Sequence, residues 1–252
     1  MVRYLLLVQY DGTHFSGYQR QGEKRTVQSE LERAAAEIFK TETRVTASGR
    51  TDAGVHAYRQ VCQVDGDTSI PAHKLAACFN ALLPSDVRIL KSAEAPNGFD
   101  CTRGAKKKTY VYTAYYAQTE LPLLERYAVR LKEKPDVGRM QEAAKLMIGE
   151  HDFAAFRAAG YTSKTSVRTL YDVRVETEVK AHSEIYRIFV TGNGFLYNMV
   201  RILAGELVSI GTGKGIDNLL KAFQTGERAL LARTMPARGL TLASVDYDTL
   251  LF

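Results

Sequence analysis

Apolar and polar residues near the start of the chain follow first the period of a β-strand and then the period of a helix. Residues 3–10 alternate and end at the turn signal Asp11-Gly12, so we expect a strand there. Residues 27–40 carry apolar side chains on one helical face, and Thr26 can cap the start of this helix. The chain therefore opens with a strand, a turn and an amphipathic helix.

The same two periods continue and predict a repeated order of elements. Further strands are expected over residues 43–48, 56–65, 87–94, 108–117, 168–179, 184–191 and 240–247. A hairpin around residues 181–183 is expected to join the strands 168–179 and 184–191. Further helices are expected over residues 73–82, 137–149 and 195–210. Each half then reads roughly strand, helix, strand, strand, helix, strand, which is typical of a ferredoxin-like unit. We therefore predict an α+β fold of two such halves, residues 1–104 and residues 105–252, which share the order of elements.

Composition narrows the class of protein. Of the 252 residues, 45% are hydrophobic and 25% charged, which is the balance of a soluble globular protein. No apolar run reaches the roughly 18 residues that a membrane-spanning helix needs. The first ten residues resemble a strand more than a signal peptide, so we expect a cytoplasmic protein that does not enter a membrane.

Cysteine and histidine spacing gives no sign of a metal site. The three cysteines are far apart and form no C-x-x-C pair, and the five histidines show no H-x-x-x-H or H-x-H spacing. We therefore expect neither a disulfide framework nor a bound metal.

The positive charge favours a polyanionic partner. The net charge is +6, and cations gather in two short stretches near residues 103–108 and 157–168. No basic amphipathic helix accompanies them, so RNA fits better than a membrane. A solvated protein surface would explain the same clusters. The candidates for phosphate contact are Arg103, Lys106, Lys107, Lys108, Arg157, Lys164 and Arg168.

One short segment is suited to hold a reactive carboxylate. In residues 47–57, small residues enclose Arg50 and Asp52 directly after a predicted strand. Gly49 and Gly54 permit backbone angles that other residues avoid, and they allow a ligand to come close. A turn held on the surface by a local Arg–Asp pair would have the same pattern.

Five motifs in the chain resemble those of one enzyme family. Residues 49–57 fit G-R-T-D-x-G-V-H-A, residues 10–21 fit Y-D-G-T-x-F-x-G-W-Q-x-Q, and residues 107–112 fit a basic K/R-x-Y-x-Y strand. Residues 151–156 fit H-D-F-x-x-F, and residues 194–201 contain F-L-x-x-M-V-R. Taken in their order along the chain, the motifs are similar to those of TruA-type tRNA pseudouridine synthases. Tyr18 stands where the family has Trp, and Arg157 where it often has Cys.

The resemblance implies a fold, a substrate and a reaction. It implies that the two halves form a continuous, mostly antiparallel sheet with helices on one side and a central RNA-binding cleft. Uridines at positions 38, 39 and 40 of the tRNA anticodon stem-loop would be isomerised to pseudouridine by a homodimer. Breaking the N1–C1′ bond and rejoining the base through C5 involves no redox step, so no cofactor is expected.

The resemblance also assigns roles to individual residues. Asp52 would be the catalytic carboxylate, and Arg201 would pair with it and lower its pKa. Tyr110 would stack on the flipped uracil, although it could equally be a core tyrosine. Arg50 would contact the RNA and fill the space that the base leaves, although a simple phosphate contact suits it too.

Two other functions remain open from the residues alone. Two ferredoxin-like halves with basic, aromatic strands would suit a tandem RNA-binding module, which would not need Asp52. A hydrolase could use Asp52 with His56 or His151, and it would release free uracil from RNA. Gly211-Thr212-Gly213-Lys214-Gly215 lacks the P-loop spacing and is expected to be a helix end followed by a loop.

Overall fold

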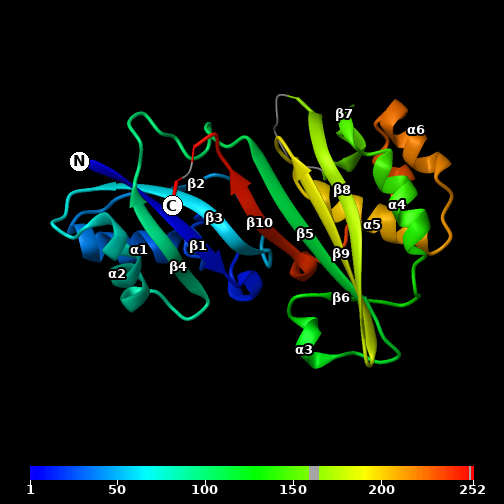
Figure 1. Ribbon diagram of the computed structural model, residues 1–252, viewed down its shortest axis with the longest axis horizontal. Helices are drawn as coiled ribbons and strands as arrows, with labels where there is room; N and C mark the ends of the chain where they lie inside the picture. The colour runs from blue at the N-terminus through cyan, green and yellow to red at the C-terminus, as the bar shows by residue number, and fades with distance from the viewer. Residues whose placement is uncertain (159–164, 250) are drawn as a thin grey trace. The chain divides into compact units, whose positions relative to one another are not determined.

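The computed structural model describes residues 1–158, 165–249 and 251–252 (Figure 1). The chain divides into two compact units, which we describe separately. Unit 1 comprises Met1–Lys108 and Thr241–Phe252, and unit 2 comprises Thr109–Leu240. In the described ranges, no helix combines the length and the hydrophobicity that crossing a membrane requires.

Unit 1 is a mostly antiparallel sheet with two helices. Its strands are β1 (Val2–Tyr10), β2 (Val45–Ala47), β3 (His56–Gly66), β4 (Val87–Glu94) and β10 (Leu240–Asp246). Its helices are α1 (Val27–Phe39) and α2 (Leu75–Leu82), with short 3-10 turns η1 (Gly12–His14) and η2 (Ala72–Lys74). The strand order is β4-β1-β3-β10, and β2 pairs with β3. Only β10 runs parallel to its neighbour β3 among these pairs.

Strand β1 is buried on both faces, which explains its apolar run. On one face Tyr4 stacks on Phe39 of α1, with ring centroids 5.7 Å apart, and Phe39 packs edge-on against Phe79 of α2. On the other face Leu7 packs with Val61 and with residues from the end of the chain. A strand covered on both sides does not alternate between polar and apolar residues, so the alternation expected over residues 3–10 was wrong, although the strand itself is present.

Helix α1 begins where the sequence predicts. The Thr26 side chain accepts a hydrogen bond from the Ser29 backbone N–H, and the Ser29 hydroxyl lies 3.1 Å from the Thr26 nitrogen. This reciprocal capping satisfies two backbone donors at the helix start. The helix ends at Phe39, and the next residue, Lys40, has a left-handed φ of 56°.

Unit 2 is a second mostly antiparallel sheet with helices. Its strands are β5 (Lys107–Tyr116, whose first two residues belong to unit 1), β6 (Val129–Leu131), β7 (Gly149–Asp152), β8 (Val167–Lys180) and β9 (Ser183–Gly192). Its helices are α3 (Pro122–Glu125), α4 (Val137–Lys145), α5 (Met199–Gly211) and α6 (Asp217–Thr225), with 3-10 turns η3 (Ala154–Phe156), η4 (Arg228–Leu230) and η5 (Ala237–Gly239). The strand order is β5-β9-β8-β7, and β6 runs parallel to β5. The predicted hairpin is present, because Lys180 of β8 pairs with Ser183 of β9.

The α+β class is confirmed, and several details differ from the sequence-based expectation. Helix α4 ends at Lys145 rather than at Gly149, which begins β7, and α3, α6, β6 and β7 were not expected. Residues 241–252 belong to the first unit, because β10 pairs with β3 and the Tyr247 hydroxyl donates to the Cys101 carbonyl at 2.7 Å. Helix α5 begins at Met199 rather than near residue 195, because Asn198 has a left-handed φ of 61°. That conformation ends any helix that approaches it.

The segment 211–215 is a helix end, as expected, and it completes a buried ion pair. Helix α5 stops at Gly211, and the Lys214 ammonium turns back to donate to Glu206 at 2.8 Å and to the Leu230 carbonyl at 2.7 Å. Glu206 is fully buried and also accepts from the Ala232 N–H at 2.7 Å. The loop lysine therefore neutralises a carboxylate inside unit 2.

Removing the lysine alone should destabilise the protein. In Lys214→Met the buried Glu206 charge loses its partner, and we expect the free energy of unfolding to fall by about 3 kcal/mol. Adding Glu206→Gln removes that charge and keeps an acceptor for Ala232, so the double variant should recover most of the loss. Urea unfolding measures both, and equal stability of the two variants would contradict the prediction.

Candidate active site

Asp52 lies in the loop that joins β2 to β3. Its side chain is half-buried, and its carbonyl accepts a hydrogen bond from the Val55 N–H at 3.1 Å, which closes a tight turn. Gly54 inside this turn has a φ of +77°, a conformation that glycine adopts without strain. The turn therefore brings the chain back into β3 directly after the carboxylate.

Three carbonyls of this loop are fixed by groups from other segments. The Lys108 ammonium donates to the Ser48 carbonyl at 2.7 Å, the Gln60 amide to the Gly49 carbonyl at 2.8 Å, and the Tyr18 N–H to the Thr51 carbonyl at 3.0 Å. Burial lowers the pKa of the Lys108 ammonium. These bonds fix the backbone that leads into Asp52, and the Val55 N–H closes the turn after it, so the carboxylate is held by a rigid backbone.

The last residue of β1 and the segment after it form a cradle for the Asp52 loop. The Tyr10 hydroxyl lies 2.7 Å from the Thr51 hydroxyl in a buried hydrogen bond, and the Gly54 N–H donates to the Phe15 carbonyl at 3.4 Å. Gly12 packs against the loop so closely that a Cβ there would lie 2.0 Å from the Val55 oxygen. Two motifs about forty residues apart in the sequence thus form one structural unit.

A bidentate ion pair supports this cradle from outside. The Arg25 guanidinium donates two hydrogen bonds to the Asp86 carboxylate, at 2.8 and 2.9 Å, and lies over the Phe15 ring at 4.2 Å. The backbone of the same pair is also engaged, since Ser16 donates to the Arg25 carbonyl and Asp11 donates to the Asp86 carbonyl. The hydrogen bonds from Arg25 hold the pKa of Asp86 below its usual range.

The basic residues of unit 1 differ in whether a carboxylate of the protein already pairs with their charge. Arg50 is exposed and makes no hydrogen bond or ion pair with any residue that the structure describes. Lys106 pairs with Asp248 at 2.9 Å, and this hydrogen bond raises the pKa of the lysine. Arg103 and Lys107 are both exposed. Arg50 is therefore the cation that stands beside Asp52 in the sequence with its charge uncompensated.

Tyr110 lies in unit 2 on strand β5. Its ring is 8% exposed and packs edge-on against Phe195, with centroids 5.1 Å apart. Tyr112 on the same strand is fully buried, and its hydroxyl donates to the Pro236 carbonyl at 2.8 Å. Tyr110 is thus the tyrosine of this pair that keeps a small exposed edge.

Arg201 occupies the first turn of α5 and is oriented by its surroundings. Its Nε donates to the Met235 carbonyl and its Nη1 donates to the Asn198 side-chain oxygen, both at 2.6 Å. The guanidinium is half-buried, and its Nη2 has no hydrogen-bond partner among the described residues of unit 2. No motif could identify Met235, because it holds Arg201 through its backbone carbonyl, a group that every residue carries.

The H-D-F-x-x-F segment belongs to the core of unit 2. Phe153 and Phe156 are fully buried, and both rings pack against Phe223 of α6. The Asp152 side chain accepts from the Ala154 N–H, and the His151 ring lies 4.8 Å from Phe223. These contacts fit a structural role for the segment.

The remaining candidates give little support to the other functions. His56 is buried and its Nδ1 accepts from the Gly12 N–H at 3.0 Å, so it braces the cradle. Arg168 donates to the Thr165 carbonyl, Arg157 is half-buried, and Lys164 lies outside the described residues. Within the described part of the chain, no three His, Cys, Asp or Glu side chains converge as metal ligands would.

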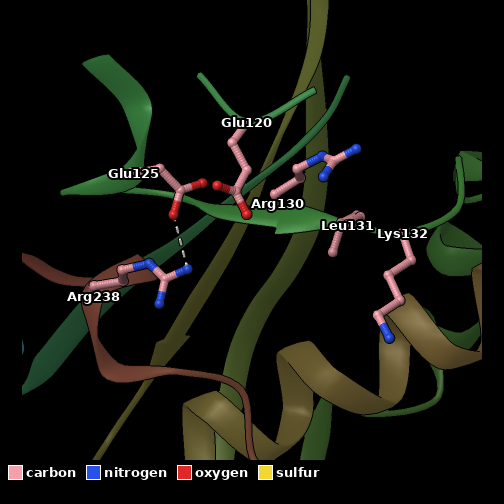
Figure 2. A pocket seen from close by; sticks show the side chains of 6 residues that line it. All are labelled: Glu120, Glu125, Arg130, Leu131, Lys132 and Arg238. Carbon is pink, nitrogen blue, oxygen red and sulfur yellow. Dashed lines mark hydrogen bonds and ion pairs between the residues drawn. The ribbon is translucent and has the colours of Figure 1, made fainter. Parts of the chain in front are cut away.

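A pocket of unit 2 contains none of the predicted site residues (Figure 2). It is lined by Glu120, Glu125, Arg130, Leu131, Lys132 and Arg238. Its central carboxylate, Glu125, already pairs with Arg238 at 3.1 Å and accepts from the Tyr115 hydroxyl at 2.5 Å. These internal bonds tie α3 to β5 and to η5, so the charges of the pocket have a structural role.

Protonating Asp86 should weaken the cradle. A carboxyl whose pKa is depressed by folding stabilises the protein above its unfolded pKa of about 3.9 and loses that contribution as the pH falls through the folded value. We expect Asp86→Asn to lower the free energy of unfolding by about 1 kcal/mol at pH 7. The difference from the wild type should shrink below about pH 4. Urea unfolding from pH 7 to pH 3 measures it, with exposed Asp67→Asn as control, and a pH-independent difference would contradict it.

A methyl group at Gly12 should push the Asp52 loop away. Gly12→Ala places its Cβ 2.0 Å from the Val55 oxygen. We expect a loss of about 1–3 kcal/mol in the free energy of unfolding, because this contact can relax only by moving backbone. Gly215→Ala is the matched control, since no atom lies within 4 Å of the added carbon. Similar stability of the two variants would contradict the prediction, because the Asp52 loop would then move away from residue 12 at little cost in free energy.

Comparison with known proteins shows the family. Among solved structures, the crystal structure of the archaeal box H/ACA sRNP Nop10-Cbf5 complex is only weakly similar, with a TM-score of 0.37 and 13% sequence identity. The match covers 82% of this chain and 44% of that one. A tRNA pseudouridine synthase A of Shouchella clausii (strain KSM-K16) is 43% identical over 254 residues, covering 100% of this chain and 96% of that protein. The enzyme of the same name from Geobacillus sp. (strain WCH70) is 42% identical over 95% of this chain and 96% of its own length.

The family model agrees with these relatives. The model described as tRNA pseudouridine synthase matches residues 6–103 and 143–248, which include Asp52 and Arg201. The resemblance inferred from the motifs is thereby confirmed. The chain belongs to the tRNA pseudouridine synthase family of isomerases.

Proposed function

We propose that this protein isomerises uridine to pseudouridine at positions 38, 39 and 40 of the tRNA anticodon stem-loop, with Asp52 as its catalytic carboxylate. Family membership supports the reaction and the class of RNA. The observation that carries the catalytic assignment is the Asp52 loop, whose flanking carbonyls are fixed by Lys108, Gln60 and Tyr18. A catalytic group needs such a rigid support.

The reaction needs a carboxylate beside the ribose and the base. The N1–C1′ bond of uridine breaks, the uracil turns, and a C5–C1′ bond forms while the C5 proton is lost and N1 gains a proton. Asp52 can attack covalently, stabilise positive charge at C1′, or remove a sugar proton. Atoms and electrons balance within the substrate and solvent, so the proposal includes no cofactor and no metal.

Two residues of unit 2 complete the proposal. Tyr110 stacks on the uracil after it has left the RNA helix, and base–aromatic stacking recovers roughly 1–3 kcal/mol of the cost of flipping. Arg201 pairs with Asp52 and keeps it ionised. The Met235 and Asn198 oxygens that hold the Arg201 guanidinium support a role in which its direction matters.

The proposal extends to RNA contacts, assembly and location. Exposed Arg50 fills the space that the flipped base leaves, and Arg103, Lys106 and Lys107 contact phosphates. The protein acts as a homodimer in the cytoplasm, where its tRNA substrate is found. Light scattering at micromolar concentration tests the dimer, and a monomer there would contradict it.

Replacing Asp52 should abolish the reaction without loss of tRNA binding. We would use tRNA transcripts tritiated at uracil C5, with uridine present at only one of positions 38, 39 and 40. The wild type should release tritium from each, because rejoining through C5 expels that hydrogen. Asp52→Asn should lower the rate by roughly 10³-fold or more, because it keeps the size of the side chain and removes its charge.

The control is Asp152→Asn, which keeps the acceptor for the Ala154 N–H and should release tritium at the wild-type rate. Release by Asp52→Asn would mean that the carboxylate is misplaced. No release by the wild type from any transcript, with binding retained, would favour an RNA-binding module. Release from uridines elsewhere in the tRNA would overturn only the assigned positions.

A further inference from the structure

Strand β3 contains a bulge directly after the Asp52 loop. Val8 of β1 pairs with Gln60, whereas Tyr10 pairs with Ala57, so Gln9 alone lies opposite two residues of β3. Those two residues are Tyr58 and Arg59. Bulges of this kind turn side chains out of the regular alternation of a strand.

The bulge exposes both of its side chains. Tyr58 is 53% exposed and Arg59 is exposed, although the flanking Ala57 and Gln60 are buried. Neither side chain makes a hydrogen bond, an ion pair or a ring contact with the residues that the structure describes. An exposed tyrosine alone is ordinary, but here an aromatic ring and an uncompensated cation stand side by side.

This pair lies next to the anchor of the Asp52 loop. Gln60, the next residue, accepts from the Ser48 hydroxyl at 2.6 Å and donates to the Gly49 carbonyl at 2.8 Å. The bulge is thus fixed to the same backbone that carries Arg50 and Asp52. Arg50 and Arg59 together provide two exposed, unpaired cations on this part of unit 1, which suits a polyanion.

We propose that Tyr58 and Arg59 form a nucleotide subsite that binds the tRNA beside the target uridine. The Tyr58 ring stacks on an unpaired base, and the Arg59 guanidinium binds a backbone phosphate. The subsite rests on the proposed function, because it is the Asp52 loop that defines where the target lies. It contributes to binding and not to the chemical step.

The test separates binding from catalysis. Dissociation constants for tRNA would be measured by filter binding between 50 and 200 mM salt, and kcat and KM by tritium release. Tyr58→Ala should raise the dissociation constant and KM roughly 10-fold, with kcat at saturating tRNA unchanged, because stacking is lost. Tyr58→Phe keeps the ring and should behave as the wild type.

Replacing Arg59 should change how steeply the affinity for tRNA falls as the salt concentration rises. Arg59→Gln should lower the slope of log affinity against log salt by roughly 0.7–0.9, the share of one phosphate contact, and Arg59→Lys should keep it. Arg33→Gln on α1 is the matched control, because that guanidinium already pairs with Glu30 and Glu37. Thermal unfolding of each variant checks that the fold is intact.

Either of two results would overturn the subsite. One is wild-type affinity and salt slope in both Tyr58→Ala and Arg59→Gln. The other is a lower kcat with unchanged binding, which would place the pair in the chemical step. Because filter binding does not depend on turnover, a wild type that binds tRNA without releasing tritium would overturn the proposed function alone and leave the subsite comparison valid.

Discussion

The hydrogen bonds between the Asp52 loop and the segment that follows β1 are the constraint on which unit 1 depends. The Tyr18 N–H and the Tyr10 hydroxyl both engage Thr51, the residue before the carboxylate. On the other side the Gly54 N–H reaches the Phe15 carbonyl. A loop without regular structure is usually mobile, and these bonds replace the sheet ladder that it lacks.

Close backbone contact is what makes glycine necessary in this region. A Cβ at Gly12 would overlap the Val55 carbonyl, and a Cβ at Gly17 would lie 2.9 Å from the Thr51 oxygen. At Gly17 the backbone also has a φ of +90°, which other residues rarely adopt. The motif of residues 10–21 therefore forms the surface against which the motif of residues 49–57 packs.

The sequence predicts well those features that depend on local pattern. The capped start of α1 at Thr26, the β8–β9 hairpin and the helix end at Gly211 follow from spacing of three to four residues or from turn chemistry, and the structure confirms them. The predicted beginning of α5 near residue 195 was wrong, because residues 195–197 continue the apolar pattern and the left-handed backbone of Asn198 alone interrupts the helix. A single left-handed residue leaves the period of apolar positions unchanged, so that period cannot predict it.

Contacts between distant segments could not be read from the chain in this way. The Arg25–Asp86 pair joins residues 61 positions apart, and the Met235 carbonyl holds Arg201 from 34 positions away. The Tyr58–Arg59 bulge depends on a register shift against β1 that no pattern within β3 reveals. The motifs locate Asp52 and Arg201, whereas the groups that hold them belong to the three-dimensional structure.

The return of β10 to unit 1 affects the order in which the protein can fold during synthesis. Asp52 and its loop leave the ribosome well before Thr241 and Leu242, which extend the sheet beside β3. The whole of unit 2 is translated in between. Nascent unit 1 must therefore wait with an open edge at the start of β3, and that edge is a place where a chaperone or another chain could pair with it before β10 is made.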